Sequence, residues 1–117
     1  MVYTVVCFLH KNPKLSNAEF QDHYENKHVP LVASRTDSSN KPLSYRRLYL
    51  PSSPSEMLVG ERPNFDVVTE LKFTDEAAFH AWSAAVNSGE GKELVEADMA
   101  QFLDAPRSVM CTATSSD

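Results

Sequence analysis

Residues 2–9 read VYTVVCFL, and both alternating sets of side chains in this stretch are mainly apolar. A run of β-branched and aromatic residues with this pattern predicts a strand, and a strand that is apolar on both faces must be covered on both. Helices of the same chain can cover one face. We expect a second copy of the chain to cover the other face, with a different partner protein as the alternative.

A helix is predicted to begin soon after this strand, because residues 16–19 (SNAE) have the form of a capping box. Pro30 disfavours helical geometry at the residue before it. We therefore expect the helix to end or kink just after His28, with a further helical turn over residues 31–35.

The rest of the chain alternates between strand and helix patterns. In chain order we predict a strand over 44–50, a long loop over 51–64, a strand over 65–73, a helix capped by Thr74, a third helical stretch over 90–103 and a strand over 107–113. This order is that of the split β-α-β, ferredoxin-like α+β fold, with a four-stranded antiparallel sheet and helices on one face. One domain over residues 1–113 and a disordered tail over 114–117 are expected.

Composition excludes several classes of protein. The chain has 117 residues and a net charge of −5, which argues against nucleic-acid binding because phosphate contacts need clustered Lys and Arg. No apolar run approaches the roughly 20 residues that cross a bilayer, so we expect no membrane association. The first residues lack the basic start and small-residue cleavage site of a secretory signal. We therefore expect a cytoplasmic protein.

Motifs for metals and nucleotides are missing from the sequence. Cys7 and Cys111 stand outside any CxxC pair, and there are three glycines and no GxSxG or HExxH motif. We expect two buried free thiols, with a redox pair as the alternative. No cofactor and no metal are expected.

One histidine lies at a position suited to proton transfer. Phe20, Tyr24 and His28 stand four residues apart, which places them on one face of an α-helix, whereas His23 is expected on the wetter side. His28 would then end an apolar stripe at a helix terminus, where unpaired carbonyls stabilise imidazolium and bring its pKa toward neutral or above. Such a histidine can exchange protons at physiological pH. The alternative is a core histidine that only caps the helix.

A carboxylate on the late helix is the second candidate. Asp98 is predicted to share an apolar helix face with Leu94, Val95 and Phe102. Burying an unpaired carboxylate is costly, so it must find a partner or stay protonated. A contact with His28 would supply the partner, and a local cap or a salt bridge to Arg107 is the alternative.

The stretch LSNAEFQDHYENKHVPLV (15–32) resembles the signature of EthD-type domains, in which F-x3-Y-x3-H is followed by x-P-L. An aspartate ahead of a Phe-Leu-Asp stretch is a second likeness, carried here by Asp98 and residues 102–104. The likeness extends from Val2 to Met110. It implies a dimeric α+β barrel, with a pocket between the helices and the sheet of each subunit.

The resemblance also implies a range of chemistry. Relatives in this superfamily include cofactor-free cyclases, decarboxylases and isomerases of polyketide and aromatic metabolism, and cofactor-free monooxygenases of quinol-like substrates. The family's histidine corresponds to His28, and its late acidic residue to Asp98. Some relatives carry a second pocket histidine on the second strand, where this chain has Tyr45 and Tyr49.

We therefore expect a cofactor-independent lyase, either a decarboxylase or a cyclase, that acts as a homodimer on an aromatic polyketide-like small molecule. His28 would exchange the proton, and Asp98 would orient its ring. Tyr24 or Tyr49 would hold a substrate oxygen. The predicted pocket wall is aromatic, with Phe8, Tyr24, Phe79, Trp82 and Phe102, and His10 near the mouth. A cofactor-free monooxygenase and a non-catalytic ligand-binding module are the alternatives.

Overall fold

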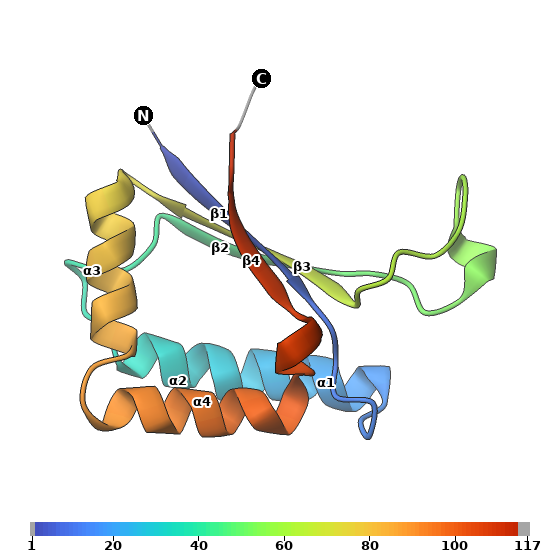
Figure 1. Cartoon of the computed structure of the whole chain (residues 1–117), viewed down its shortest axis with the longest axis horizontal. Coiled ribbons are helices and arrows are strands. Elements are labelled where there is room, and N and C mark those ends of the chain that lie inside the picture. Colours follow the sequence, from blue (N-terminus) through green and yellow to red (C-terminus); the bar gives the residue numbers. More distant parts are fainter. Residues whose placement is uncertain (1, 115–117) are drawn as a thin grey trace.

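Four strands form one antiparallel sheet in the computed structural model, which describes residues 2–114. They are β1 (Tyr3–Leu9), β2 (Ser44–Tyr49), β3 (Val67–Phe73) and β4 (Val109–Ala113), and they lie in the order β2-β3-β1-β4 (Figure 1). This order, with the helices between the strands, confirms the predicted ferredoxin-like α+β fold. The tail predicted over 114–117 lies outside the described residues apart from Thr114.

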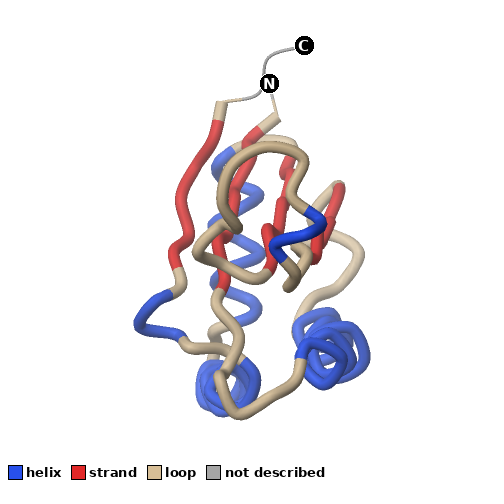
Figure 2. Tube along the Cα trace, turned by 90° about the vertical axis from the view of Figure 1, so that its right-hand side faces the viewer, coloured by secondary structure: helices blue, strands red, loops and turns tan. Residues whose placement is uncertain are grey.

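The main helices lie together on one side of the sheet (Figures 1 and 2). α1 (Asn17–His23), η1 (Tyr24–His28) and α2 (Val29–Ser34) form one continuous rod, and α4 (Glu90–Phe102) runs antiparallel beside it. α3 (Glu76–Val86) stands across the ends of both, and the short turns η2 (Pro54–Glu56) and η3 (Ala105–Arg107) precede β3 and β4. Within residues 2–114, every helix falls short of the length and apolar character needed to span a bilayer.

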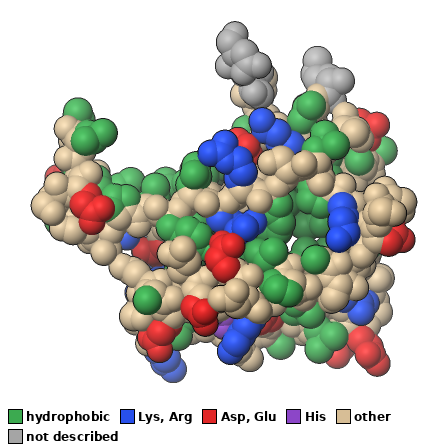
Figure 3. All heavy atoms as spheres, turned by 180° about the vertical axis from the view of Figure 1, so that it is seen from behind, with side chains coloured by type: hydrophobic (Ala, Val, Ile, Leu, Met, Phe, Trp, Pro, Cys, Tyr) green, Lys and Arg blue, Asp and Glu red, His purple; other side chains and the backbone are tan. Residues whose placement is uncertain are grey.

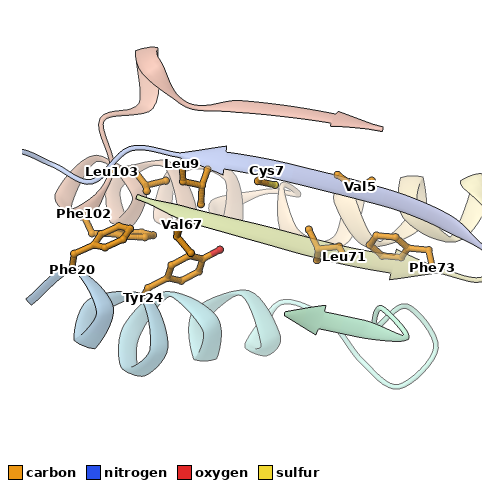
Figure 4. Close-up of a cluster of buried hydrophobic side chains, with 10 residues drawn as sticks. All are labelled: Val5, Cys7, Leu9, Phe20, Tyr24, Val67, Leu71, Phe73, Phe102 and Leu103. Carbon is orange, nitrogen blue, oxygen red and sulfur yellow. The ribbon is translucent and has the colours of Figure 1, made fainter. Parts of the chain in front are cut away.

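The hydrophobic core fills the space between the sheet and the helices (Figure 4). Phe20 of α1, Phe73 of β3 and Phe102 of α4 are each at most 2% exposed. Complete burial of one such side chain stabilises the fold by roughly 1.5–3 kcal/mol. Alternate residues of β1 and β3 meet these rings, which fixes one face of the sheet toward the helices.

The first helix does not end after His28, contrary to one of the two expectations, and the further helical turn expected over 31–35 is present in α2. It passes through η1, a π-helical turn in which the Val29 N–H donates to the Tyr24 carbonyl five residues earlier. Val29 keeps helical dihedral angles, φ −58° and ψ −47°. Pro30 follows this turn directly, at the start of the residues assigned to α2, and it removes one N–H from the backbone hydrogen bonds of the continuous helix.

Two smaller expectations are also corrected. Asp75, rather than Thr74, caps α3, because its carboxylate accepts a hydrogen bond from the Ala78 N–H at 2.8 Å.

Cys7 is buried, but Cys111 is exposed on β4, so only one of the two thiols is shielded in the monomer. Both cysteines are free, and burial raises the pKa of Cys7 to about 11.

The opposite face of the sheet carries an apolar row across all of its strands. Leu48 of β2 pairs with Val68 of β3, which pairs with Phe8 of β1, which pairs with Val109 of β4. Directly paired residues point to the same face of a sheet, so these four side chains form one row. Leu48 is 48% exposed and Val109 is 55% exposed. The two ends of the row are therefore exposed in the monomer, while Val68 and Phe8 are half-buried.

A long arm connects β2 to β3 and projects beyond the rest of the molecule (Figures 1 and 3). Leu58 and Val59 on this arm are 99% and 92% exposed. At its base, the Phe65 ring packs edge-on against Phe8 with 5.0 Å between ring centroids. The arm is thus anchored on the same sheet face that carries the apolar row.

The capping box at the start of α1 gives a direct test of the local sequence reading. Ser16 Oγ accepts from the Glu19 N–H at 3.1 Å, and Glu19 returns a bond to the Ser16 N–H at 2.9 Å. We expect Ser16→Ala to lower the free energy of unfolding in urea by about 1 kcal/mol, because it leaves a helix N–H without its partner. Ser52→Ala is the matched control, since the exposed Ser52 side chain makes no hydrogen bond within residues 2–114. Equal stability of the two variants would contradict this role.

Candidate active site

A cavity of about 310 Å³ lies between the sheet and the helices. Its wall is mainly apolar, and Phe79, Trp82 and Phe102 supply the aromatic part. The predicted pocket therefore exists, and these three side chains line it as expected. His28 and Tyr24 also line it, from the turn η1.

Asp98 joins two histidines beside this cavity. His28 Nδ1 lies 2.8 Å from Asp98 Oδ2, so the contact expected from the sequence is present. His23 Nε2 lies 2.8 Å from Asp98 Oδ1, a contact that the sequence reasoning missed. The side chains of His23, His28 and Asp98 are only 10%, 9% and 14% exposed. One carboxylate on α4 thus holds two buried imidazoles of the first helix.

The π turn explains why His23 was misplaced on the wet face. In a regular α-helix, two residues five apart point about 140° away from each other. A π turn closes its hydrogen bond over five residues, so positions i and i+5 fall on the same side. His23 directly precedes this turn, His28 is its last residue five positions later, and both reach Asp98. The two histidines at this spacing, followed by Pro30, were the signals available in the sequence.

The carboxylate determines which nitrogen of each ring carries hydrogen. An ionised carboxylate can only accept hydrogen bonds, so each imidazole must donate an N–H to Asp98. Neutral His28 is therefore protonated at Nδ1. Its other nitrogen, Nε2, is then a bare lone pair on the ring that lines the cavity. Such a nitrogen is suited to remove a proton from a bound molecule.

The environment of His28 favours its neutral form, the reverse of the sequence expectation. Burial is the largest effect, and it lowers the pKa of His28 below 6.5. The hydrogen bond to Asp98 and the negative charge of Asp98 raise this pKa in part, and the charge of His23 lowers it. The predicted rise in pKa depended on a helix terminus. Because the helix continues through Val29 into α2, the carbonyls that would stabilise an imidazolium are not at an end.

A chain of hydroxyl groups from η1 and the sheet forms a second polar part of the cavity wall. The Tyr24 hydroxyl bonds to Thr69 Oγ1 at 2.7 Å, and the Tyr45 hydroxyl donates to Tyr24 at 3.3 Å. Burial raises the pKa of Tyr24 to about 12 and also raises the pKa of Tyr45. Both phenols are therefore neutral donors near pH 7. The Tyr24 hydroxyl is held by its short hydrogen bond to Thr69. The hydrogen bond from Tyr45 to Tyr24 is longer and weaker, so the Tyr45 hydroxyl can more easily donate to a ligand instead.

Three residues predicted to bind substrate lie outside the cavity wall. Phe8 points to the other sheet face, because it alternates with Cys7 and Leu9, which do line the cavity. The His10 main chain bonds to Ser108, and its side chain is not among the lining groups. The Tyr49 hydroxyl donates to Glu25, which also pairs with Arg47, and the ring borders a separate cavity of about 180 Å³.

Leu94 also differs from its expected place, because it is 49% exposed. Val95 and Phe102, by contrast, are buried, so the apolar face of α4 is narrower than the sequence pattern suggested. Asp98 lies at the edge of this face, which is why it is largely buried and still reaches both histidines.

Comparison with known families matches residues 12–106 to the EthD domain model. The chain belongs to the EthD-domain family. The match includes His23, His28 and Asp98, so the whole carboxylate–histidine group of this EthD domain lies within the matched part.

Solved structures with this fold come from several bacteria. An EthD family protein of Bacillus halodurans is 18% identical, with a TM-score of 0.65, and the match covers 99% of this chain and 100% of that one. An EthD-like protein of Ralstonia eutropha is 17% identical, with a TM-score of 0.64 and coverage of 96% and 89%. A dimeric ferredoxin-like protein of unknown function from Thermobifida fusca is 13% identical, with a TM-score of 0.58 and coverage of 98% and 92%. At these identities the likeness establishes the fold, and a fold alone does not define a reaction. The search of curated proteins gave no match.

Replacing the shared carboxylate tests the electrostatics of the site. We expect Asp98→Asn to move the NMR titration midpoint of His28 to lower pH, because both effects of Asp98 on this ring raise its pKa. The rings bond different oxygens of Asp98, and in the amide one of these positions becomes an NH2 donor, so the free energy of unfolding should fall by about 1.5–3 kcal/mol. Glu96→Gln, an exposed carboxylate on the same helix, is the control for the change in charge. A His28 midpoint that stays the same or rises in Asp98→Asn would contradict the assignment.

Proposed function

We propose that this EthD domain is a cofactor-independent lyase, a cyclase or decarboxylase, that acts on an aromatic polyketide-like small molecule with His28 as its proton-transfer group. The observation that carries the proposal is the 2.8 Å contact between Asp98 and His28 Nδ1 beside an apolar cavity. It leaves His28 Nε2 as a base on the ring that lines this mainly apolar cavity.

The size and lining of the cavity favour a flat aromatic ligand. An apolar cavity of about 150 Å³ accommodates benzene. A volume of about 310 Å³ therefore suits a substituted compound of one or two rings. Aromatic side chains prefer stacked or edge-to-face contacts with such rings. Phe79, Trp82 and Phe102 supply these surfaces.

The proposed first step is removal of a proton by neutral His28. Nε2 takes the proton from a carbon between two carbonyl groups, and the electron pair of the C–H bond becomes an enolate. In a cyclisation this carbon attacks a second carbonyl of the same molecule, and the new alkoxide takes a proton back from His28. In a decarboxylation there is no such first step: the bond to the carboxylate carbon breaks, carbon dioxide leaves, and the carbanion takes a proton from a His28 that was protonated from solvent. The lowered pKa of His28 favours the first route, because the ring is neutral before the substrate binds.

The hydroxyl groups of the cavity would stabilise the developing negative charge. Tyr45 is the better placed donor, since its bond to Tyr24 is 3.3 Å long and can be exchanged for one to a substrate oxygen. Tyr24 would hold Tyr45 in place through its own shorter bond to Thr69. An enolate oxygen near these phenols would be stabilised more in the transition state than in the bound substrate.

Replacing His28 tests this function. We expect His28→Gln to reduce kcat by about 10²–10⁴-fold, measured by mass spectrometry of products from a panel of aromatic 1,3-dicarbonyl compounds and 2-hydroxybenzoic acids. For the wild-type protein, kcat/KM should fall as the pH drops below the pKa of His28, because a base must be unprotonated. His80→Gln is the control, since His80 is exposed and bonds only to Glu76 within residues 2–114.

The other outcomes distinguish the rival functions. Turnover that needs air and stops under argon would show a cofactor-free monooxygenase. Binding of the same compounds without turnover, unchanged in His28→Gln, would show a non-catalytic binding module. Full activity of folded His28→Gln would refute the proposed role of this residue.

We also infer that the protein works as a homodimer joined through the open sheet face. The support is the partly exposed apolar row that crosses all four strands, Leu48, Val68, Phe8 and Val109. A stable interface buries about 1,200–2,000 Å² in total, and an apolar sheet face is suited to supply it. The dimeric description of the Thermobifida fusca structure agrees with this inference.

A charge placed in the apolar row tests the dimer. We expect Leu48→Lys to shift the mass measured by light scattering from two chains to one, because the interface would bury an unpaired ammonium group. Leu94→Lys is the matched control, since Leu94 is equally exposed on the helix side. A wild-type protein that is monomeric at micromolar concentration would overturn the inference.

A further inference from the structure

His23 is buried without facing the cavity. The residue is 8% exposed, and it is not among the side chains that line the 310 Å³ space. Its ring stacks on Phe102 with 4.8 Å between centroids and an angle of 19°. Its Nε2 donates to Asp98 at 2.8 Å. A histidine held in this way can influence a bound molecule only through its neighbours, the Asp98 carboxylate and the Phe102 ring.

Sharing one carboxylate between two imidazoles limits what each can gain from it. A single negative charge can compensate one imidazolium in a buried site, and a second positive charge would be left unpaired. A positive charge on His23 accordingly lowers the pKa of His28.

We propose that His23 is a positioning residue that divides the Asp98 carboxylate between two imidazoles, and so keeps His28 neutral with its Nε2 free to accept a substrate proton. This proposal rests on the proposed function, in which His28 acts as the base. The π turn is the structural device behind it, because the turn brings His23 to the side of the helix that faces Asp98.

The groups around His28 agree with this role. Asp98 faces it from α4, His23 lies on the far side of that carboxylate, and Tyr24 precedes it on its own helix. Tyr45 and Cys7 belong to the same cavity wall, and the pKa of each is raised, so both are neutral near pH 7. The positive charge of His23 acts in the same direction as burial, toward a lower pKa for His28.

Two substitutions of His23 test the proposal by NMR titration of the His28 ring. His23→Phe keeps the stacked ring but removes the donor and the charge, so the whole carboxylate serves His28. His23→Gln removes the charge but keeps an N–H donor for Asp98. We expect the His28 midpoint to rise in the order wild type, His23→Gln, His23→Phe. His80→Gln should leave it unchanged.

A His28 midpoint that is unchanged or lower in both His23 variants would overturn the proposal. If His23→Phe fails to fold, as judged by circular dichroism, the rise expected in His23→Gln still decides the question. In both variants KM should stay within about twofold of wild type, because His23 does not contact the cavity, while the acid limb of kcat/KM moves to higher pH with the His28 midpoint. A protein that turns over none of the probes would count against the proposed function. The NMR measurement needs no substrate, so the effect of His23 on the His28 midpoint would still be decided by it.

Discussion

The rest of the site depends on the two hydrogen bonds that the Asp98 carboxylate accepts. They join α4 to the first helix at a point where both elements border the cavity. Hydrogen bonds to a charged group in a largely buried site are stronger than those between neutral groups, and losing one partner leaves the other without compensation. The same contacts therefore hold the helices together and determine the protonation of His28. The hydrogen bonds to Asp98 thus contribute both to the stability of the fold and to the proposed proton transfer by His28.

The π turn makes that interaction possible. A regular helix would bring one of the two histidines to α4 and point the other elsewhere. The wider turn over Tyr24–His28 aligns both, and Pro30 directly after it fits a helix that has lost one regular hydrogen bond. Such turns have poorer packing than regular helix, and they persist where the aligned side chains offset that cost. Here the aligned side chains are the two partners of Asp98.

The sequence was sufficient for the architecture because each signal was local. The alternation in residues 2–9 and the capping box at residues 16–19 predicted elements that the structure contains. The contact of His28 with Asp98 could also be anticipated, since an aspartate among apolar residues needs a partner. The position of His23 could not be derived from a period of 3.6 residues, because the helix changes its period at that point. Alternation likewise separates Phe8 from Cys7 but does not say which of the two faces the helices. The hydroxyl chain of Tyr24, Tyr45 and Thr69 depends on strands and a helix far apart in sequence.

Neutral His28 carries its hydrogen on Nδ1, toward Asp98, and leaves Nε2 without a proton on the ring that lines the cavity. Long-range proton–nitrogen NMR of the wild-type protein with ¹⁵N-labelled histidine, at pH 7.5, measures this directly. We expect a His28 ring protonated at Nδ1, with the nitrogen shift of a lone pair at Nε2. A His28 ring that is protonated at Nε2, or at both nitrogens, at this pH would contradict it.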